Sequence, residues 1–427
     1  MRLREISKWE PSTARVALAA AALCLLAYLP FFQLPLISDD YLQIGLARKY
    51  GTWKGQQTLF ADALYRCRAT SLWVTWVIDR LFGPNVFPLA AFCLLVHVAN
   101  CILVFFLGNW TPIGRGVAAA AALFFAVYEG HQEAVVWISA MPELLVFFFG
   151  TACLAFWQRW LRGAGAGWLV AVVLAFLLAL LSKESGVVVP GLLVLFAIVE
   201  RAAWRRWIGP VAVLAVLTLL YTYSIFLAKQ THLHFNDGTF SLSAPFFKTI
   251  AVSVARLFWF WGALAVAAGL WSRSLEFRRV LALSGVWIIF TFLPYVFLTY
   301  MPRVPSRHTY WASAGLALVV GAALVQCLPR LTDRKVVLAG VAAAMILHNC
   351  GYLWMKKLGQ YQERARPTEE LIEFSRRSPN PVRVRCFPYG SDIVFYALEI
   401  VGHRDASQVE IDPLAEGDAY CFVPRED

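Results

Sequence analysis

The chain has 427 residues, of which 59% are hydrophobic and 15% are charged, and its formal net charge is +11. Soluble globular domains carry about 25% charged residues, so this composition excludes an ordinary soluble enzyme and indicates an integral membrane protein. The basic residues fall between apolar runs and form no single face or tail, which excludes a nucleic-acid-binding protein.

Long apolar runs recur along the chain and predict about eleven transmembrane helices. The first run follows a basic N-terminal segment. It is too long for the apolar region of a signal peptide and no cleavage site follows it, so we expect it to remain as a span. The predicted spans are 16–36, 87–108, 117–128, 143–158, 167–182, 186–200, 208–228, 249–271, 280–300, 309–328 and 336–354.

The short loops between these spans carry a charge bias that predicts the orientation. The predicted inner loops contain twelve basic residues and two acidic ones, Glu276 and Asp333, whereas the short outer loops contain five basic residues. Because positive charge is retained in the cytoplasm, we expect a cytoplasmic N-terminus. The twelve inner residues are Arg115, Arg159, Arg162, Arg201, Arg205, Arg206, Arg273, Arg278, Arg279, Arg330, Arg334 and Lys335, and the five outer ones are Lys183, Lys229, Lys248, Arg303 and Arg307.

The first predicted outer loop, 37–86, opens with two aspartates, Asp39 and Asp40, directly after the first span. A carboxylate at the membrane boundary is costly unless a cation, a metal ion or a substrate faces it. A helix N-cap for the segment that follows is the structural alternative. The pair therefore predicts a site on the outer face of the membrane, with Asp39 and Asp40 as its catalytic carboxylates.

Seven further polar residues fall at the predicted outer ends of the spans, and one more, Arg66, lies within the first outer loop. Together they suggest a single outward-facing cavity that binds substrate. Each also has a structural alternative, such as an arginine that reaches lipid headgroups or a hydrogen-bonded core histidine. The candidate substrate-binding residues are Arg66, His131, Glu133, Glu143, Lys183, Glu184, Arg303 and Arg307.

The chemistry of this set favours transfer from a lipid-linked phosphate. A carboxylate can deprotonate an acceptor hydroxyl, and arginine and lysine bind phosphate oxygens. A leaving group that is a lipid phosphate suits a site at the bilayer edge. A carboxylate can also hold a divalent metal ion that neutralises the phosphate. Whether a metal ion is bound stays open, and Asp39 and Asp40 are the residues that would hold it.

The tail, 355–427, changes character and predicts a small α/β appendage outside the membrane. Two strand-like pieces, Val382–Phe387 and Asp418–Val423, flank a helix-like piece, Asp392–Val401. Cys386 and Cys421 each lie in one strand-like piece. They form either a disulfide, which an oxidising compartment permits, or two free thiols on neighbouring strands.

Several short motifs, in order from about Ser38 to Gly315, resemble the GT-C glycosyltransferases that use polyprenyl-phosphate sugars. The resemblance is closest to the protein O-mannosyltransferase and TMTC-like branch. The matching residues are Asp39-Asp40; Tyr65-Arg66; Leu81, Phe82, Gly83, Asn85, His97 and Asn100; Glu133-Ala134-Val135; Glu143-Leu144-Leu145; Ser182 to Gly186 with Pro190; and Arg307, Tyr310, Ser313 and Gly315. The resemblance implies a mannosyltransferase-like enzyme whose first aspartate of the pair is the general base or metal-facing carboxylate, and helices in the first loop that lie along the membrane.

We therefore expect an all-α, GT-C-like polytopic protein of the cytoplasmic membrane, with a transmembrane glycosyltransferase domain at 1–354 and an extracytoplasmic tail at 355–427. Its expected partners are membrane lipids, a polyprenyl-phosphate sugar donor and an acceptor of unidentified class. Two alternatives stay open: a lipid or glycolipid transporter, and a non-catalytic GT-C-like scaffold.

Overall fold

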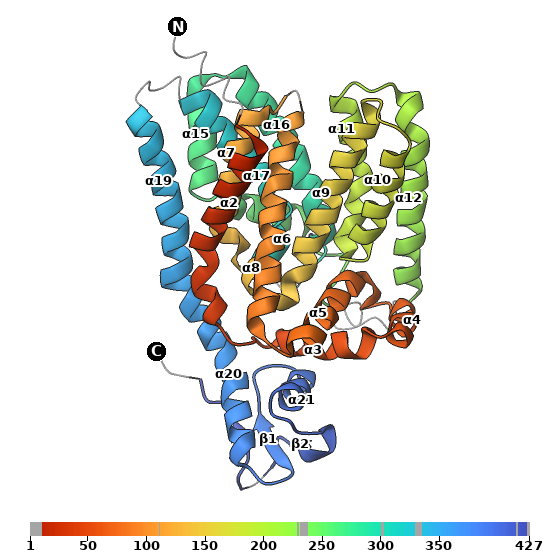
Figure 1. Ribbon diagram of the computed structural model, residues 1–427, viewed down its shortest axis with the longest axis vertical. Helices are drawn as coiled ribbons and strands as arrows, with labels where there is room; N and C mark the ends of the chain where they lie inside the picture. Colours follow the sequence, from red (N-terminus) through yellow and green to blue (C-terminus); the bar gives the residue numbers. More distant parts are fainter. Residues whose placement is uncertain are drawn as a thin grey trace.

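The computed structural model describes residues 11–110, 112–228, 230, 238–299, 303–328, 335–415 and 417–424. These form a bundle of helices with a small unit at one end (Figure 1). The helices of the bundle are α2 (Thr13–Tyr28), α6 (Val86–Phe106), α7 (Arg115–Val127), α9 (Met141–Leu161), α10 (Gly167–Leu180), α11 (Val189–Val199), α12 (Trp204–Leu227), α14 (Phe246–Leu257), α15 (Trp261–Ser272), α16 (Leu275–Phe292), α17 (Ser313–Ala322) and α19 (Lys335–Tyr352).

Each predicted span contains one of these helices, and the span at 249–271 contains two. Within the described residues, six helical segments are long and apolar enough to cross a membrane. The α14–α15 pair counts as a seventh if its two helices, bent by 84° at the break, form one span. The other four predicted spans are shorter apolar helices, α7, α10, α11 and α17. Of the loop charges counted above, Lys229, Arg330, Asp333 and Arg334 lie outside the described residues.

The first loop lies along the end of the bundle that carries the C-terminal unit (Figure 1). It contains α3 (Asp39–Tyr50), α4 (Trp53–Ala61), the 3₁₀ turn η2 (Arg66–Arg68) and α5 (Ala69–Phe82). Thr52 begins α4, because its side chain accepts a hydrogen bond from the backbone of Gly55 at 3.1 Å, as N-cap residues do. This loop places the aspartate pair at that end of the bundle.

Shorter elements at the same end connect the long helices and carry many of the predicted site residues. They are η1 (Leu29–Gln33), η4 (Glu129–His131), α8 (Gln132–Val136), η5 (Ile138–Ala140), η6 (Glu184–Val188), η7 (Leu293–Tyr295) and η8 (Ser306–Thr309). A further 3₁₀ turn, η3 (Leu107–Asn109), and a π-helical turn, η9 (Ala323–Cys327), end α6 and α17.

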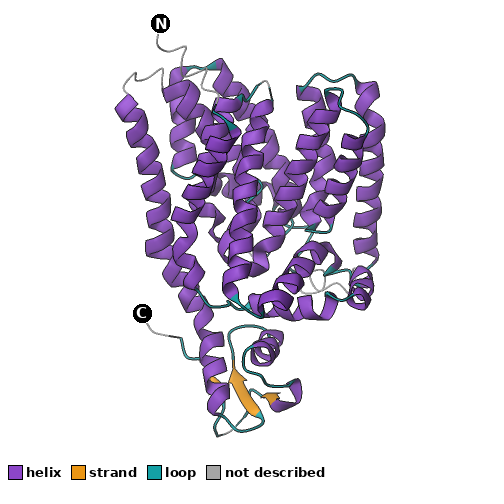
Figure 2. Cartoon of the chain, in the orientation of Figure 1, coloured by secondary structure: helices purple, strands orange, loops and turns teal. Residues whose placement is uncertain are grey.

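The C-terminal unit is an α/β unit with a three-stranded parallel sheet, and Figure 2 shows its strands beneath the helical bundle. Its strands, β1 (Val382–Cys386), β2 (Val409–Ile411) and β3 (Tyr420–Cys421), have the order β2-β1-β3. The predicted strands and helix correspond to β1, β3 and α21 (Ser391–Ile400). The prediction omitted β2, which has only three residues, and the 3₁₀ turn η11 (Ala406–Gln408).

A disulfide joins Cys386 on β1 to Cys421 on β3, the two residues being partners in the sheet register. This decides between the alternatives left open by the sequence.

The unit is joined to the bundle by a continuous helical segment and by a close contact. The segment, 42 residues from Val336 to Arg377, runs through α19, the π-helical turn η10 (Leu353–Lys357) and α20 (Leu358–Arg377). The predicted boundary between 354 and 355 falls inside it. A Cβ at Gly45 of α3 would lie 2.2 Å from the Tyr396 ring of α21, so the first loop packs on the unit where only glycine fits.

Candidate functional site

The two aspartates at the start of α3 have different surroundings. Asp40 is buried, and its carboxylate accepts hydrogen bonds from the Ile37 amide at 3.0 Å and from the Ser139 amide and hydroxyl at 2.9 and 3.2 Å. Burial raises the pKa of Asp40 to about 7, against the pull of these donors. Asp40 therefore links the start of α3 to η5, and both of its oxygens are in use.

Asp39 makes no hydrogen bond and no ion pair with any residue that the structure describes. Burial raises the pKa of its carboxyl above the usual range, and the nearby guanidinium groups of Arg307, Arg364 and Arg68 partly counteract that rise. The preceding residue, Ser38, has a φ of +40°, which non-glycine residues rarely adopt and which is typical of functional sites. Asp39 is thus a free, partly buried carboxylate on a strained turn.

The three arginines near Asp39 come from three distant parts of the sequence. Arg68 belongs to η2 of the first loop, Arg307 to η8 and Arg364 to α20. Arg307 is held by Glu133, whose carboxylate accepts from the Arg307 amide at 3.1 Å and lies 3.8 Å from its guanidinium group. The predicted pair Glu133 and Arg307 thus lies at the site.

Trp137 lies between α8 and η5 and contacts two of these arginines. The guanidinium carbon of Arg364 is 4.4 Å from the Trp137 ring centroid and that of Arg307 is 5.1 Å from it. The indole is buried, and among the described residues its Nε1 has no hydrogen-bond acceptor. Among the described residues the buried indoles of Trp110 and Trp311 also lack an acceptor, so Trp137 differs from them in having two arginines on its ring.

Arg68 connects the site to a buried group of charges. Its Nε is buried and has no partner among the described residues, and Glu184 and Glu143 are the nearby carboxylates. Glu184 in turn lies near Lys183. The predicted residues Glu143, Lys183 and Glu184 therefore lie next to Arg68.

Glu143 is the centre of that buried group. The Lys183 ammonium donates to its Oε1, the His308 imidazole contacts the same oxygen, and the Tyr295 hydroxyl donates to Oε2 at 2.9 Å. All four side chains are buried. With both Glu143 oxygens engaged, this group holds the elements around Arg68 and leaves no carboxylate oxygen of Glu143 free for a substrate.

Three predicted site residues lie elsewhere. Arg66 donates to the Ser224 hydroxyl of α12 at 2.9 Å. His131 is fully buried and pairs with the Ser313 hydroxyl at 2.6 Å, which is the structural alternative considered for it. Arg303 is exposed. None of the three is among the charged neighbours of Asp39.

The aspartate pair does not offer the ligand set of a divalent cation. Magnesium and calcium ions require several free oxygen ligands, whereas Asp40 already accepts three hydrogen bonds and Asp39 faces three arginines.

Cys24, His97 and Cys101 do lie together in the core of the bundle. The His97 nitrogens contact the Tyr310 hydroxyl at 2.7 Å and the Ala126 carbonyl at 3.3 Å, as in a satisfied core histidine.

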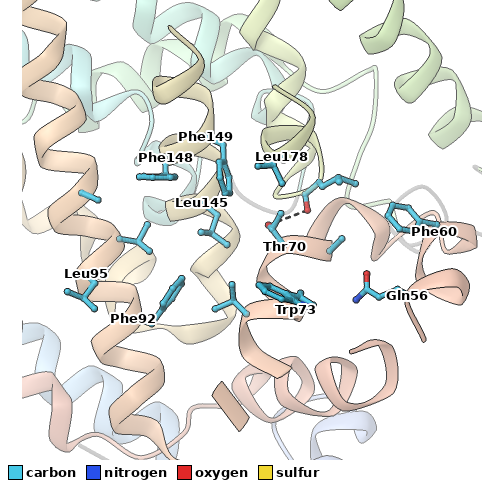
Figure 3. A pocket seen from close by; sticks show the side chains of 15 residues that line it. Gln56, Phe60, Thr70, Trp73, Phe92, Leu95, Leu145, Phe148, Phe149 and Leu178 are labelled. Carbon is cyan, nitrogen blue, oxygen red and sulfur yellow. Dashed lines mark hydrogen bonds between the residues drawn. The ribbon is translucent and has the colours of Figure 1, made fainter. Parts of the chain in front are cut away.

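An apolar cavity of about 560 Å³ lies between α4, α5, α6, α9 and α10. Its lining includes Phe60, Trp73, Phe92, Leu95 and Phe148, which surround it in Figure 3. Ala69 and Thr70 also line it and directly follow Arg68 in the chain. The cavity therefore reaches the backbone that directly follows Arg68.

Comparison with solved structures identifies the fold. ArnT from Cupriavidus metallidurans bound to undecaprenyl phosphate aligns with a TM-score of 0.59 and 16% identity, over 92% of this chain and 86% of ArnT. Apo ArnT aligns with a TM-score of 0.54 and 16% identity, over 94% and 90%. The apo oligosaccharyltransferase of Archaeoglobus fulgidus aligns with a TM-score of 0.50 and 13% identity, over 94% of this chain and 64% of that one.

The chain has a GT-C-like fold. Together with its apolar helices this makes it an integral membrane protein. No family model and no curated protein matches the sequence, and these structural neighbours give no support to the O-mannosyltransferase and TMTC-like branch in particular.

Sequence reasoning missed Arg68, Trp137 and Arg364. Arg66 and Arg68 are two residues apart on a 3₁₀ turn, and periodicity alone does not show which of them turns toward Asp39. Arg364 follows the last apolar run in a charged helix, among many other charges. The one signal for Trp137 was its position within the segment from Glu129 to Glu143 that already held candidate residues.

Proposed function

We propose that this protein is a membrane glycosyltransferase that moves a sugar from a polyprenyl-phosphate donor to an acceptor hydroxyl, with Asp39 as the general base. The observation that carries the proposal is the Asp39 carboxylate, which makes no hydrogen bond to a described residue and lies near three arginines, in a GT-C-like fold. The structural neighbour ArnT binds undecaprenyl phosphate, which supports a polyprenyl-phosphate lipid as partner here.

The reaction needs one proton acceptor and one site for the leaving group. Asp39 takes the proton of the acceptor hydroxyl as its oxygen attacks the anomeric carbon of the sugar. The bond between that carbon and the phosphate oxygen breaks, and the electron pair leaves with the polyprenyl phosphate. Arg68 and Arg307 stabilise the added negative charge, as positioned cations do in phosphoryl leaving groups.

We assign the apolar cavity to the first isoprene units of the donor lipid. Its volume of about 560 Å³ lies within the range of ligand pockets, about 300–1,000 Å³. A phosphate held at Arg68 would place the attached chain next to Ala69 and Thr70, at the cavity lining. The hydrophobic lining would then provide binding energy for the lipid chain, and Arg68 would orient the phosphate.

We place the site on the extracytoplasmic face. The positive-inside bias of the loops supports this orientation. The Cys386–Cys421 disulfide in the unit at the same end of the bundle supports it as well, because disulfides persist in oxidising compartments. A reporter enzyme fused after the C-terminal unit tests the orientation, since it would be active only outside the cytoplasm.

The proposed activity is tested by mass spectrometry of lipid-linked and surface glycans. Cells that lack the protein are compared with cells that express the wild type or Asp39→Asn. We expect a glycan that depends on the wild-type protein and that Asp39→Asn fails to restore at equal expression. Restoration by the variant would favour the scaffold alternative. A change in lipid distribution without a change in glycan structure would favour the transporter.

A further inference from the structure

Helix α20, which joins the bundle to the C-terminal unit, supplies a cation whose charge the proposed reaction does not use. The guanidinium group of Arg364 makes no hydrogen bond and no ion pair with any described residue. It rests against the rings of Trp137 and Tyr361, with its carbon 4.4 and 5.8 Å from their centroids. Aromatic contacts of this kind fix an arginine and leave its N–H donors free.

The position of Arg364 is set by contacts on both sides of α20. Tyr361 donates from its hydroxyl to Gln132 of α8, and Tyr389 of the C-terminal unit donates to the backbone carbonyl of Arg364 at 2.8 Å. Asp39 and Arg364 are both electrostatic neighbours of Tyr389. The unit and the bundle therefore meet at Arg364, beside the proposed base.

The charges of the three arginines are balanced to different degrees. Arg307 is paired with Glu133, and Arg68 lies near Glu184 and Glu143. Arg364 forms no ion pair with a described residue, and it lowers the pKa of the nearby Asp39 carboxyl. Its guanidinium group covers the ring of Trp137, whose Nε1 has no acceptor among the described residues. Arg364 and Trp137 thus form a set of free donors. Arg307 lies on the same indole ring, 5.1 Å from its centroid, so this set adjoins the proposed donor site.

We infer that Arg364 and Trp137 form an oxyanion-binding subsite for the acceptor, so that the acceptor carries a phosphate or carboxylate group near the hydroxyl that receives the sugar. The guanidinium fork matches both anions in geometry, and the indole N–H supplies one more donor. This inference rests on the proposed function, which assigns Arg68 and Arg307 to the phosphate of the donor.

The test uses the full-length protein in phosphatidylcholine nanodiscs, which carry no net charge. Farnesyl phosphate is added first as a short donor-product analogue, and glycerol phosphate, malonate or glycerol is then titrated into the saturated protein by calorimetry. We expect a second anion to bind and glycerol not to bind. Preference for glycerol phosphate or for malonate identifies phosphate or carboxylate as the acceptor group.

The variants separate the two subsites. Arg364→Gln should weaken the second anion about tenfold or more, the loss expected for hydrogen bonds between charged groups, and should leave farnesyl phosphate binding within twofold. Arg68→Gln should weaken farnesyl phosphate. Arg366→Gln is the matched control, because Arg366 lies on the same helix and pairs with Glu363 and Glu370.

The outcomes distinguish this inference from the function on which it rests. If the wild type binds farnesyl phosphate and no second anion, the acceptor subsite is refuted and the donor site stands. If Arg364→Gln weakens farnesyl phosphate as strongly as Arg68→Gln does, Arg364 belongs to the donor site and the inference is wrong. Failure of the wild type to bind farnesyl phosphate counts against the proposed function itself.

Discussion

Substitution of Asp39 by asparagine separates a catalytic carboxylate from a structural one. The amide has nearly the same shape but cannot accept a proton. Asp39 makes no hydrogen bond to a described residue, so none is lost. Burial raises the pKa of Asp39 in spite of three nearby arginines, which means that the protein disfavours the charged form. We therefore expect Asp39→Asn to fold and to unfold at the same temperature as the wild type or slightly higher.

The expected loss of activity follows from the role of the base. General-base catalysis contributes about 10²–10⁴-fold, equivalent to about 3–5 kcal/mol of activation free energy. Asp40→Asn should behave in the opposite way. Its carboxylate accepts from both the Ile37 and the Ser139 amides, and an asparagine offers one oxygen for the two. One buried N–H would lose its acceptor, at a cost of about 1–3 kcal/mol.

The assay compares both variants with the wild type in proteoliposomes that contain a polyprenyl-phosphate sugar and an extract of acceptor lipids and glycans. Sugar transfer is measured by mass spectrometry, and stability by size-exclusion chromatography after heating. We expect Asp39→Asn to be stable and inactive, and Asp40→Asn to be less stable, with activity that follows the folded fraction. Transfer by Asp39→Asn within tenfold of the wild type would refute the assignment of the base.

Four further outcomes are expected. Ala99 of α6 lines the apolar cavity, so Ala99→Trp should fill it and raise the KM for a polyprenyl-phosphate sugar. Leu347→Trp, at an exposed position of α19, should leave the KM unchanged; equal KM values for the two variants would exclude this cavity as the lipid site. Transfer should fall as the pH drops through the raised pKa of Asp39, because the protonated carboxyl is no base; a kcat/KM profile whose acid limb lies at or below about pH 4 would contradict this. The folded-state pKa of Asp40 is raised to about 7, so its contribution to stability should be full below about pH 4 and decline as the pH rises toward 7. The unfolding temperature of the wild type should therefore fall over this pH range by an amount that is missing in Asp40→Asn. Cys386→Ser should lower the free energy of unfolding of the C-terminal unit by about 2–4 kcal/mol, so a protease should cleave the tail faster than in the wild type. An unchanged rate of cleavage would show that the disulfide contributes little to stability.

Much of the architecture could be predicted from the sequence, because a membrane restricts the chain to a few solutions. Each apolar run had to become a helix, since no other segment satisfies its own backbone hydrogen bonds in lipid, and every predicted span contains one. Alternating apolar residues in Val382–Phe387 likewise predicted β1. β2 was missed because its three residues carry no periodic pattern. The assignment of Asp39 and Asp40 to a membrane boundary followed from their position after the first apolar run.

Tertiary structure decided which of the polar residues form the site. Asp39 and Asp40 are adjacent in the sequence, but only the fold brings Ser139 to Asp40 and leaves Asp39 free. Likewise, Arg68 and Arg364 are separated by nearly three hundred residues, and in the fold both lower the pKa of the Asp39 carboxyl. Composition and spacing fix which segments enter the membrane, because that depends on local hydrophobicity. Which side chains share a site depends on how helices distant in the sequence pack together, and no local pattern records that.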